Sequence, residues 1–450
     1  MNPRNVLPLA VTLSLSCGGS GSPRPAPREL EFSGTAAVRV SPAKSGELLL
    51  LFETLQPQLL ITSPIRSAGL LRAGPDIVQT YAAPDGFILL DAVAHPSGEV
   101  SLLSVQLRQQ TGADYPLRAI VSRISPDGAR LDRELSRLPP PTGTEAPPAF
   151  IASLDRARLV AHGEDLYALV RWANNSVQAY RLETRALEQK WATFIEPPAT
   201  LLITGIIGGG FDNFHQGDGP FFVHGDVDSQ GNLYVAVVST DELLTAHDAF
   251  FGENLTSFAD PANFDFGAAV LTRIAADGSR TFARLLGMPG RGKRPLTLRV
   301  AGESAILAGR VRTGNQPESW DAWLLSVRTA TGDLAWERNI DVQSGDMFWD
   351  VSPLSGGRFL AVGSTNYTQN PSGLSVSDAR DPLAVILDSL GNVEKRIVLP
   401  VGPAGRGNEA MSVRVGDRDQ VAISGVHNAP GTHAPVFSDA FLVVRSLEVF

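Results

Sequence analysis

Aromatic, acidic and histidine side chains gather in two stretches of this chain, Glu196–Pro220 and Thr240–Phe266. Rings next to carboxylate and imidazole groups favour ligand binding, because the rings supply contact area and the polar groups supply specificity. The candidate ligand-binding residues are Phe211, Asp212, Phe214, His215, Asp218, Phe250, Phe251 and Phe264. The alternative is that the phenylalanines pack the two stretches onto each other and over a central channel.

Patterns that would hold a metal ion are incomplete. The run Asp226-Val227-Asp228-Ser229-Gln230-Gly231 is similar to the start of a calcium loop, but Val237 stands where the bidentate acid belongs. Asp228 is therefore expected to stabilise a turn through its short side chain. A second group lacks a spaced ligand pair on one element; it comprises His215, Asp218, His224 and Asp226. We predict no metal site and no cofactor.

Motifs for covalent or metal-assisted catalysis are missing from the sequence. It contains no G-x-S-x-G elbow, no H-E-x-x-H pair and no phosphate-binding glycine loop. We therefore predict no catalytic residues and favour a non-enzymatic protein. The enzymatic alternative is a polysaccharide-acting enzyme with two facing carboxylates, which would come from Asp212, Asp218, Asp241, Glu242 or Asp248.

The N-terminal segment predicts export. Arg4 precedes the short apolar run Val6–Leu13, which suits the core of a signal peptide and is too short to span a bilayer. The following residues, up to Cys17-Gly18, resemble the lipobox of bacterial lipoproteins, with Ser14 in place of the usual large aliphatic residue. That resemblance implies lipidation of Cys17 and attachment to the outer membrane, facing the periplasm or the cell surface. The alternative is a plain secretory signal with an incidental cysteine.

Composition favours an all-β fold rich in turns. The 450 residues are 43% hydrophobic and only 19% charged, and they include 43 glycines and 32 prolines. No long stretch shows a helical apolar period. The net charge of −9 argues against nucleic acid as a partner.

A two-strand unit recurs along the chain. Ser319–Ile340 reads as two strands around the turn Thr331-Gly332-Asp333, and weaker copies place equivalent turns at regular intervals. The turn positions are Gly69, Gly128, Leu187, Gly278, Gly332 and Gly391, spaced by 59, 59, 91, 54 and 59 residues. Such spacing predicts a repeat array of four-stranded units.

We predict a single β-propeller of seven four-stranded blades, with six or eight as alternatives. The last unit has only three strands, so Glu29–Phe32 is expected to pair with Ala440–Ser446 and close the ring. The domain plan is a signal peptide (1–16), a lipidated cysteine and flexible tether (17–28) and the propeller (29–450). Long loops are expected on one face, the long-loop face; they include Arg108–Leu117 and the two longest, Glu196–Pro220 and Thr240–Phe266.

The repeats resemble a known family. Asp321-Ala322-Trp323-Leu324-Leu325, Asp439-Ala440-Phe441-Leu442-Val443 and turns such as Asp277-Gly278 are similar to bacterial β-propeller repeats that read D-A-F-L-V-x-L-D-x-x-G-x-x-x-W. This resemblance implies the fold and frequent export, and it implies no catalytic residues.

A second resemblance is to quinoprotein propellers, through Thr331-Gly332 with Trp336 and in part Trp191. The equivalent positions in the other blades are Ala73, Asp132, Phe282 and Lys395. Because those blades lack the tryptophan, we expect no quinone cofactor.

The leading hypothesis is a lipid-anchored envelope propeller that binds a protein or a glycan through its long-loop face. A polysaccharide-acting enzyme and a scaffold for outer-membrane assembly are the alternatives, because a fold does not determine a function.

Overall fold

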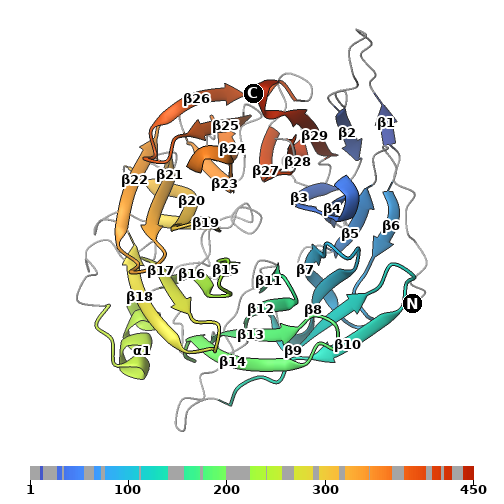
Figure 1. The fold of residues 1–450 in the computed structure, drawn as a ribbon, viewed down its shortest axis with the longest axis vertical. Helices are drawn as coiled ribbons and strands as arrows, with labels where there is room; N and C mark the ends of the chain where they lie inside the picture. The colour runs from blue at the N-terminus through green and yellow to red at the C-terminus, as the bar shows by residue number, and fades with distance from the viewer. Residues whose placement is uncertain are drawn as a thin grey trace.

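The computed structural model is a closed ring of four-stranded antiparallel sheets, a seven-bladed β-propeller (Figure 1). It describes residues 11–13, 28–32, 35–54, 65–71, 77–110, 113–139, 157–172, 176–198, 223–239, 241–255, 268–286, 293–313, 320–343, 345–366, 380–401, 408–416, 420–427 and 439–449. Both the fold class and the blade number predicted from the sequence are confirmed.

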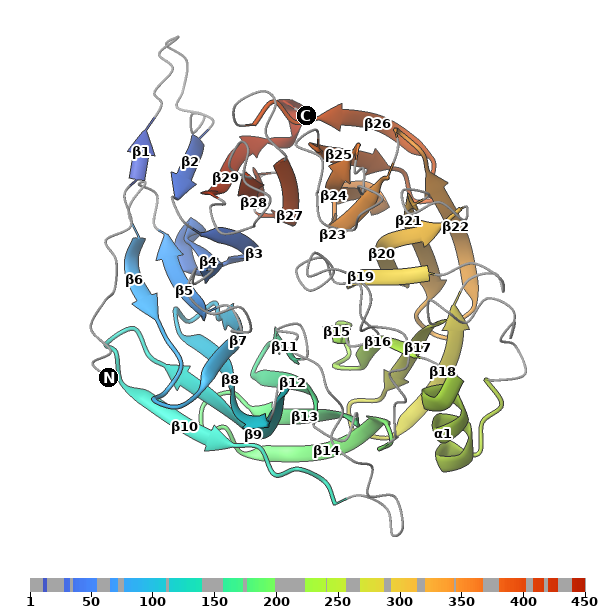
Figure 2. The ribbon, with the colours of Figure 1, turned by 180° about the vertical axis from the view of Figure 1, so that it is seen from behind.

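Each blade runs from an inner strand at the axis to an outer strand at the rim (Figures 1 and 2). Blade one contains β3 (Ala36–Pro42), β4 (Leu48–Thr54), β5 (Ile65–Leu71) and β6 (Ile77–Tyr81). Blade two contains β7 (Ile88–Ala94), β8 (Val100–Gln110), β9 (Ala113–Ile124) and β10 (Arg130–Glu134). Blade three contains β11 (Ala157–His162), β12 (Asp165–Arg171), β13 (Val177–Glu183) and β14 (Gln189–Glu196).

The remaining blades follow the same order. Blade four contains β15 (Val223–Val227), β16 (Leu233–Ser239), β17 (Ala268–Ile274) and β18 (Arg280–Leu286). Blade five contains β19 (Lys293–Ala301), β20 (Ser304–Arg312), β21 (Trp320–Arg328) and β22 (Leu334–Ile340). Blade six contains β23 (Met347–Pro353), β24 (Phe359–Thr365), β25 (Asp381–Leu387) and β26 (Val393–Val398). Blade seven contains β27 (Asn408–Val415), β28 (Gln420–His427), β29 (Asp439–Ser446) and the N-terminal strand β2 (Arg28–Phe32).

Strand β2 closes the ring as the sequence predicts. It pairs antiparallel with β29, with Leu30 opposite Leu442 and Phe32 opposite Ala440. A further strand, β1 (Val11–Leu13), pairs with the outer side of β2. It lies within the segment predicted to be the signal peptide.

The hydrophobic core is divided among the blade interfaces. Seven clusters of buried apolar side chains occur in the described residues, and each joins one blade to the next. At the closing interface, Phe32 of β2 is fully buried and packs edge-on against Phe52 of β4, with ring centroids 5.2 Å apart. A blade therefore buries its faces only by packing against its two neighbours.

Most predicted hairpin turns are confirmed by backbone geometry. Gly128, Gly278, Gly332 and Gly391 all have positive φ, a region in which glycine carries no steric penalty. Leu187 takes the same conformation with φ of 54°, and its side chain is fully buried in the interface between blades two and three. Apolar burial thus offsets the missing glycine in blade three.

Three sequence-based expectations are wrong. Gly69 lies inside β5, paired with Leu50 and Thr80, at a point where a Cβ would lie only 3.1 Å from the side chains of Phe52 and Ile77. Arg108–Leu117 is no loop, since β8 and β9 extend as one long hairpin in which Gln110 pairs with Ala113. The stretch after β16 contains a helix, α1 (Asp241–Phe251).

No helix among the described residues has the length and apolar character that crossing a membrane requires.

The closing interface generates a stability prediction. Replacing Phe32 with alanine should lower the free energy of unfolding by about 3–5 kcal/mol, because it leaves a cavity between the first and last blades. Leu390→Ala is the control, since that side chain is 65% exposed and should change the free energy by no more than about 0.5 kcal/mol. Denaturant titration followed by tryptophan fluorescence measures both. Equal stability of the two variants would contradict a closing role for β2.

Candidate functional site

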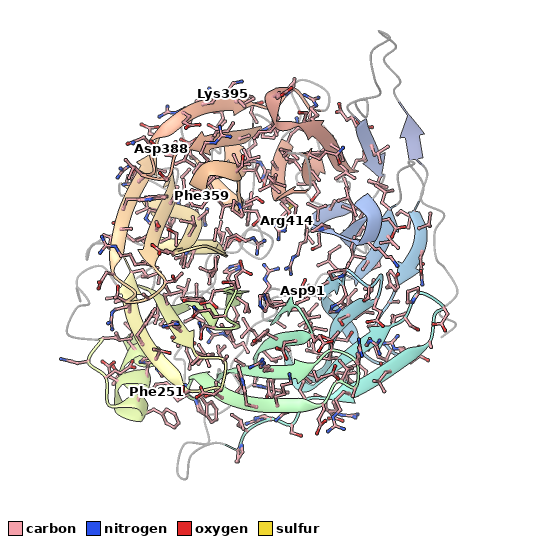
Figure 3. All side chains as sticks on the ribbon, viewed as in Figure 1. Asp91, Phe251, Phe359, Asp388, Lys395 and Arg414 are labelled. Atoms are coloured by element: carbon pink, nitrogen blue, oxygen red, sulfur yellow. The ribbon has the colours of Figure 1, made fainter. Side chains whose placement is uncertain are left out.

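The predicted binding residues are only partly within the described structure. Phe211, Asp212, Phe214, His215, Asp218 and Phe264 lie outside the described residues, as does Cys17. Phe250 and Phe251 lie on α1, which is inserted between β16 and β17 at the rim of the ring (Figures 1 and 2). Figure 3 shows Phe251 at this outer edge, far from Asp91 and Arg414 near the axis.

Helix α1 is anchored to the interface between blades three and four. Leu244 is fully buried and Leu255, just after the helix, is 6% exposed, and both belong to the apolar cluster of that interface. The carboxylate of Asp248 accepts a hydrogen bond from the backbone N–H of Leu255 at 2.8 Å. The N–H of Gly252 donates to the carbonyl of Asp248, and Gly252 has a φ of 67°, a common way to end a helix.

The two phenylalanines of α1 have different environments. Phe250 is 41% exposed and contacts Phe194 of β14 edge-on, with centroids 5.6 Å apart. Phe251 is partly buried, and the guanidinium carbon of Arg280 lies 3.8 Å from its ring centroid. Phe250 is thus available to a ligand, whereas Phe251 holds the helix to β18 through a cation–π contact.

A hydrogen-bond network beneath α1 centres on Arg280. Its guanidinium donates to both carboxylate oxygens of Glu253 at 3.1 Å and to the carbonyl of Ile195 at 3.3 Å. It also contacts Nε2 of the buried His247 at 2.6 Å. Because arginine can only donate, Nε2 must be the acceptor and the imidazole proton must reside on Nδ1.

The environment of His247 disfavours its charged form. Burial lowers its pKa first, and the charge of Arg280 lowers it further, against the opposite effects of Glu196, Glu253 and Asp248. Nδ1 lies 3.6 Å from Glu253 and 3.7 Å from Asp248. Neutral His247 is therefore part of what holds α1 in place.

A buried ion pair lies at the same blade boundary. Arg171, at the end of β12, contacts Glu196, at the end of β14, at 2.7 Å, and both side chains are 1% exposed. The hydroxyl of Ser239, at the end of β16, donates to the other oxygen of Glu196. These three residues tie the ends of three strands together directly where the two predicted binding stretches begin.

Two of the acids considered for metal binding or catalysis, Asp228 and Asp248, have structural roles. Asp228 accepts hydrogen bonds from the backbone N–H groups of Gln230 and Asn232, both at 2.9 Å. It therefore stabilises the turn between β15 and β16, as expected. Asp248 caps α1. Within the described ranges, no group of three or more histidine, cysteine or acidic side chains is placed to hold a metal ion.

Sequence analysis missed a ring of charged residues around the propeller axis. Each inner strand contributes a charged residue to this ring, an arginine in blades one, three, five and seven and an aspartate in blades two, four and six, and β19 and β27 carry further charged residues. In blade order the members of this axial ring are Arg39, Asp91, Arg158, Asp226, Arg299, Asp350 and Arg414. Figure 3 shows two of them, Asp91 and Arg414, on the inner side of the ring.

The carboxylates of the axial ring connect neighbouring blades. Each one accepts a hydrogen bond from the backbone N–H of the next residue in its own strand and another from the inner strand of the following blade. The second bonds are 2.8 Å from Leu159 to Asp91, 2.8 Å from Val300 to Asp226 and 3.2 Å from Val413 to Asp350.

The arginines of the axial ring contact these carboxylates. Arg39 forms an ion pair with Asp91, whose side chain is fully buried. Asp350 lies between Arg299 at 3.0 Å and Arg414 at 2.6 Å. These three arginine side chains are 13–16% exposed, so some solvent reaches them.

Charges from several blades act on the pKa values of groups near the axis. Burial acts to lower the pKa of Arg39, but Asp91, Asp350 and Asp226 more than offset this and hold that pKa above its usual value. Burial raises the pKa of Asp226, although Arg299 and Arg39 oppose the rise. Burial, and then the charges of Arg158, Arg299 and Arg39, hold the pKa of His224 well below its usual value.

Comparisons with known proteins assign no family to this chain. No family description and no curated protein matches this sequence. Among solved structures, a chain of the mitotic checkpoint complex is 10% identical, with 97% of this chain and 99% of that chain covered and a TM-score of 0.48. The propeller domain of the trilobed protease from Pyrococcus furiosus is 7% identical, with 89% and 92% covered and a TM-score of 0.44. A Bacteroides caccae protein of unknown function is 11% identical, with 77% and 94% covered and a TM-score of 0.37.

The network beneath α1 predicts a pH-dependent stability. The lowered pKa means that unfolded His247 binds protons more readily than folded His247, so its contribution is complete above about pH 6.5 and declines as the pH falls below that value. His247→Gln should lose less stability than the wild type between pH 7.5 and pH 5, because glutamine can still accept from Arg280 without gaining charge. Thermal unfolding across this range measures the difference.

His162→Gln is the control, because His162 is a partly exposed residue at the end of β11. It leaves the buried histidines unchanged and should retain the wild-type pH dependence. If the His247 variant also followed the wild-type curve, the neutral imidazole would have no role in holding α1.

Proposed function

We propose that this protein is a non-enzymatic binding protein of the cell envelope, attached by a lipid on Cys17 and binding a protein or a glycan through its long-loop face. The observation that carries the proposal is the anchored helix α1, which presents the exposed ring of Phe250 at the boundary between blades three and four. An aromatic side chain on a rigid support is a favourable binding anchor, because little conformational entropy is lost on binding.

Strand direction supports a common face for both predicted binding stretches. In an antiparallel four-stranded blade, the second strand and the fourth strand end on the same face. The stretch after β14 and the stretch after β16 therefore both begin on one face, which is also where Arg171, Glu196 and Ser239 meet. Loops on a rigid scaffold are common sites of recognition.

The position of the closing strand is compatible with lipidation. Processing before Cys17 would remove β1 and keep β2, which forms the contact with β29. Ten residues rich in glycine, serine and proline separate Cys17 from β2. Such a tether reaches up to about 30 Å, enough to hold the propeller away from a membrane surface.

The proposal predicts loss of binding when the exposed ring is removed. Phe250→Ala should reduce partner recovery in an in-cell crosslinking pulldown by roughly tenfold, because truncating an aromatic anchor typically costs 2 kcal/mol or more, about that factor or greater. Leu390→Ala is the matched control, since Leu390 is an exposed apolar residue in the turn between β25 and β26, on the opposite face. Equal recovery of every partner by the two variants would contradict the proposal.

Lipid attachment has its own test. Cells given an alkyne-tagged fatty acid should label the wild-type chain and not Cys17→Ala, because the thiol is the acceptor for the acyl chain. The variant should also move from the membrane fraction to the soluble fraction. Labelling that persists in Cys17→Ala would refute the anchor while leaving the binding face untouched.

A further inference from the structure

We propose that the axial ring binds a small oxyanion, a phosphate or carboxylate group, between Arg39 and Arg414 where the last blade meets the first. This inference is independent of the proposed function, because it concerns the axis and not the long-loop face.

The charge count of the axial ring favours an anion. Arginine and aspartate alternate from blade one to blade seven, so the last blade and the first blade both contribute an arginine. These two arginines are Arg39 on β3 and Arg414 on β27, whose strands lie side by side at the closing interface (Figure 1). Four arginines against three aspartates leave the ring with a net charge of +1 when all are ionised.

The aspartates are committed to holding the blades together. Asp91 and Asp226 each accept two backbone N–H groups, and Asp350 accepts two more, besides the hydroxyl groups of Thr297 and Ser412. These bonds hold the carboxylates in place, with Asp91 paired to Arg39 and Asp350 paired to Arg414. Each arginine of the closing interface thus keeps one carboxylate partner, and the net charge of +1 belongs to the ring as a whole.

The two arginines of the closing interface retain donor capacity. Within the part of the chain that the structure describes, both side chains form hydrogen bonds through Nη1 only. Nη1 of Arg39 donates to Asp91. Nη1 of Arg414 donates to Asp350 and to the backbone carbonyl of Val413. A guanidinium has five N–H donors in a planar fork that matches phosphate and carboxylate oxygens. Two such forks from adjacent strands can bind the oxygens of one oxyanion.

The closing interface also supplies a polar contact. The hydroxyl of Ser412 on β27 accepts from the N–H of Val40 on β3 at 3.2 Å and donates to Asp350, so this interface has a hydroxyl where other blade pairs have a carboxylate. Arg158 and Arg299, in blades three and five, make the ring as a whole positive. Partial burial strengthens such interactions, because the effective dielectric constant falls well below that of water.

Calorimetric titration of the full chain in non-ionic detergent, at constant ionic strength, tests the proposal with inorganic phosphate and succinate as probes. The wild type should bind at least one of them with a stoichiometry of one. The tighter probe shows whether the natural ligand carries a phosphate or a carboxylate. Absence of saturable binding by both probes would overturn the proposal.

Substitutions of opposite effect separate binding from stability. Arg39→Gln and Arg414→Gln should each weaken binding about tenfold or more, because each removes charge-assisted hydrogen bonds. Arg414→Lys keeps the positive charge but loses the planar guanidinium group, so it should bind the probes with intermediate affinity. This variant keeps the proposal testable if the glutamine variants fail to fold. Asp226→Asn should tighten binding several-fold, because it raises the net charge of the ring by one.

Arg118→Gln is the control, since it removes a charge from an exposed ion pair between β9 and β10, 48% and 47% exposed. It should bind the probes as the wild type does. An equal loss of affinity in Arg118→Gln and Arg414→Gln would show that overall charge is responsible, and it would overturn a site at the axis.

Discussion

The packing of each blade against two neighbours is the constraint on which this structure depends. All seven apolar clusters in the described residues lie between blades, and a sheet left without a neighbour would expose an apolar face. The last interface cannot form until β2, near the N-terminus, completes the blade formed by β27, β28 and β29. Phe32 is buried there against Phe52, so a few residues determine whether the whole ring is closed.

Polar groups near the axis reinforce this apolar packing. In blades two and six, a β-bulge in the inner strand comes directly before the aspartate that bonds to the next blade. In blade six a glycine on the adjacent strand accommodates the bulge, because a Cβ on Gly363 would lie 1.9 Å from the carbonyl oxygen of Met347. Bulge, glycine and carboxylate thus act together, so a substitution at one of them should disturb the others.

Binding at the rim would depend on apolar contact, whereas binding at the axis would depend on charge. At the rim, Phe250 offers apolar area on a helix whose position depends on the neutral imidazole of His247 and on Arg280. At the axis, the offered group is a pair of guanidinium groups in a partly buried, positively charged setting. The first suits a large partner on the surface, and the second suits a small anion, so the two sites do not compete.

The sequence by itself determined the strands, most turns and the closure of the ring. These features depend on local alternation of apolar residues and on glycines such as Gly128 and Gly278, whose effect requires no distant contact. Helix α1 was missed because its buried residues, Leu244 and His247, make a short pattern that gains meaning only against the interface between blades three and four. The axial ring depended entirely on tertiary structure: its members are single charged residues separated by 51 to 73 positions, and only the closed ring of blades brings them to one axis.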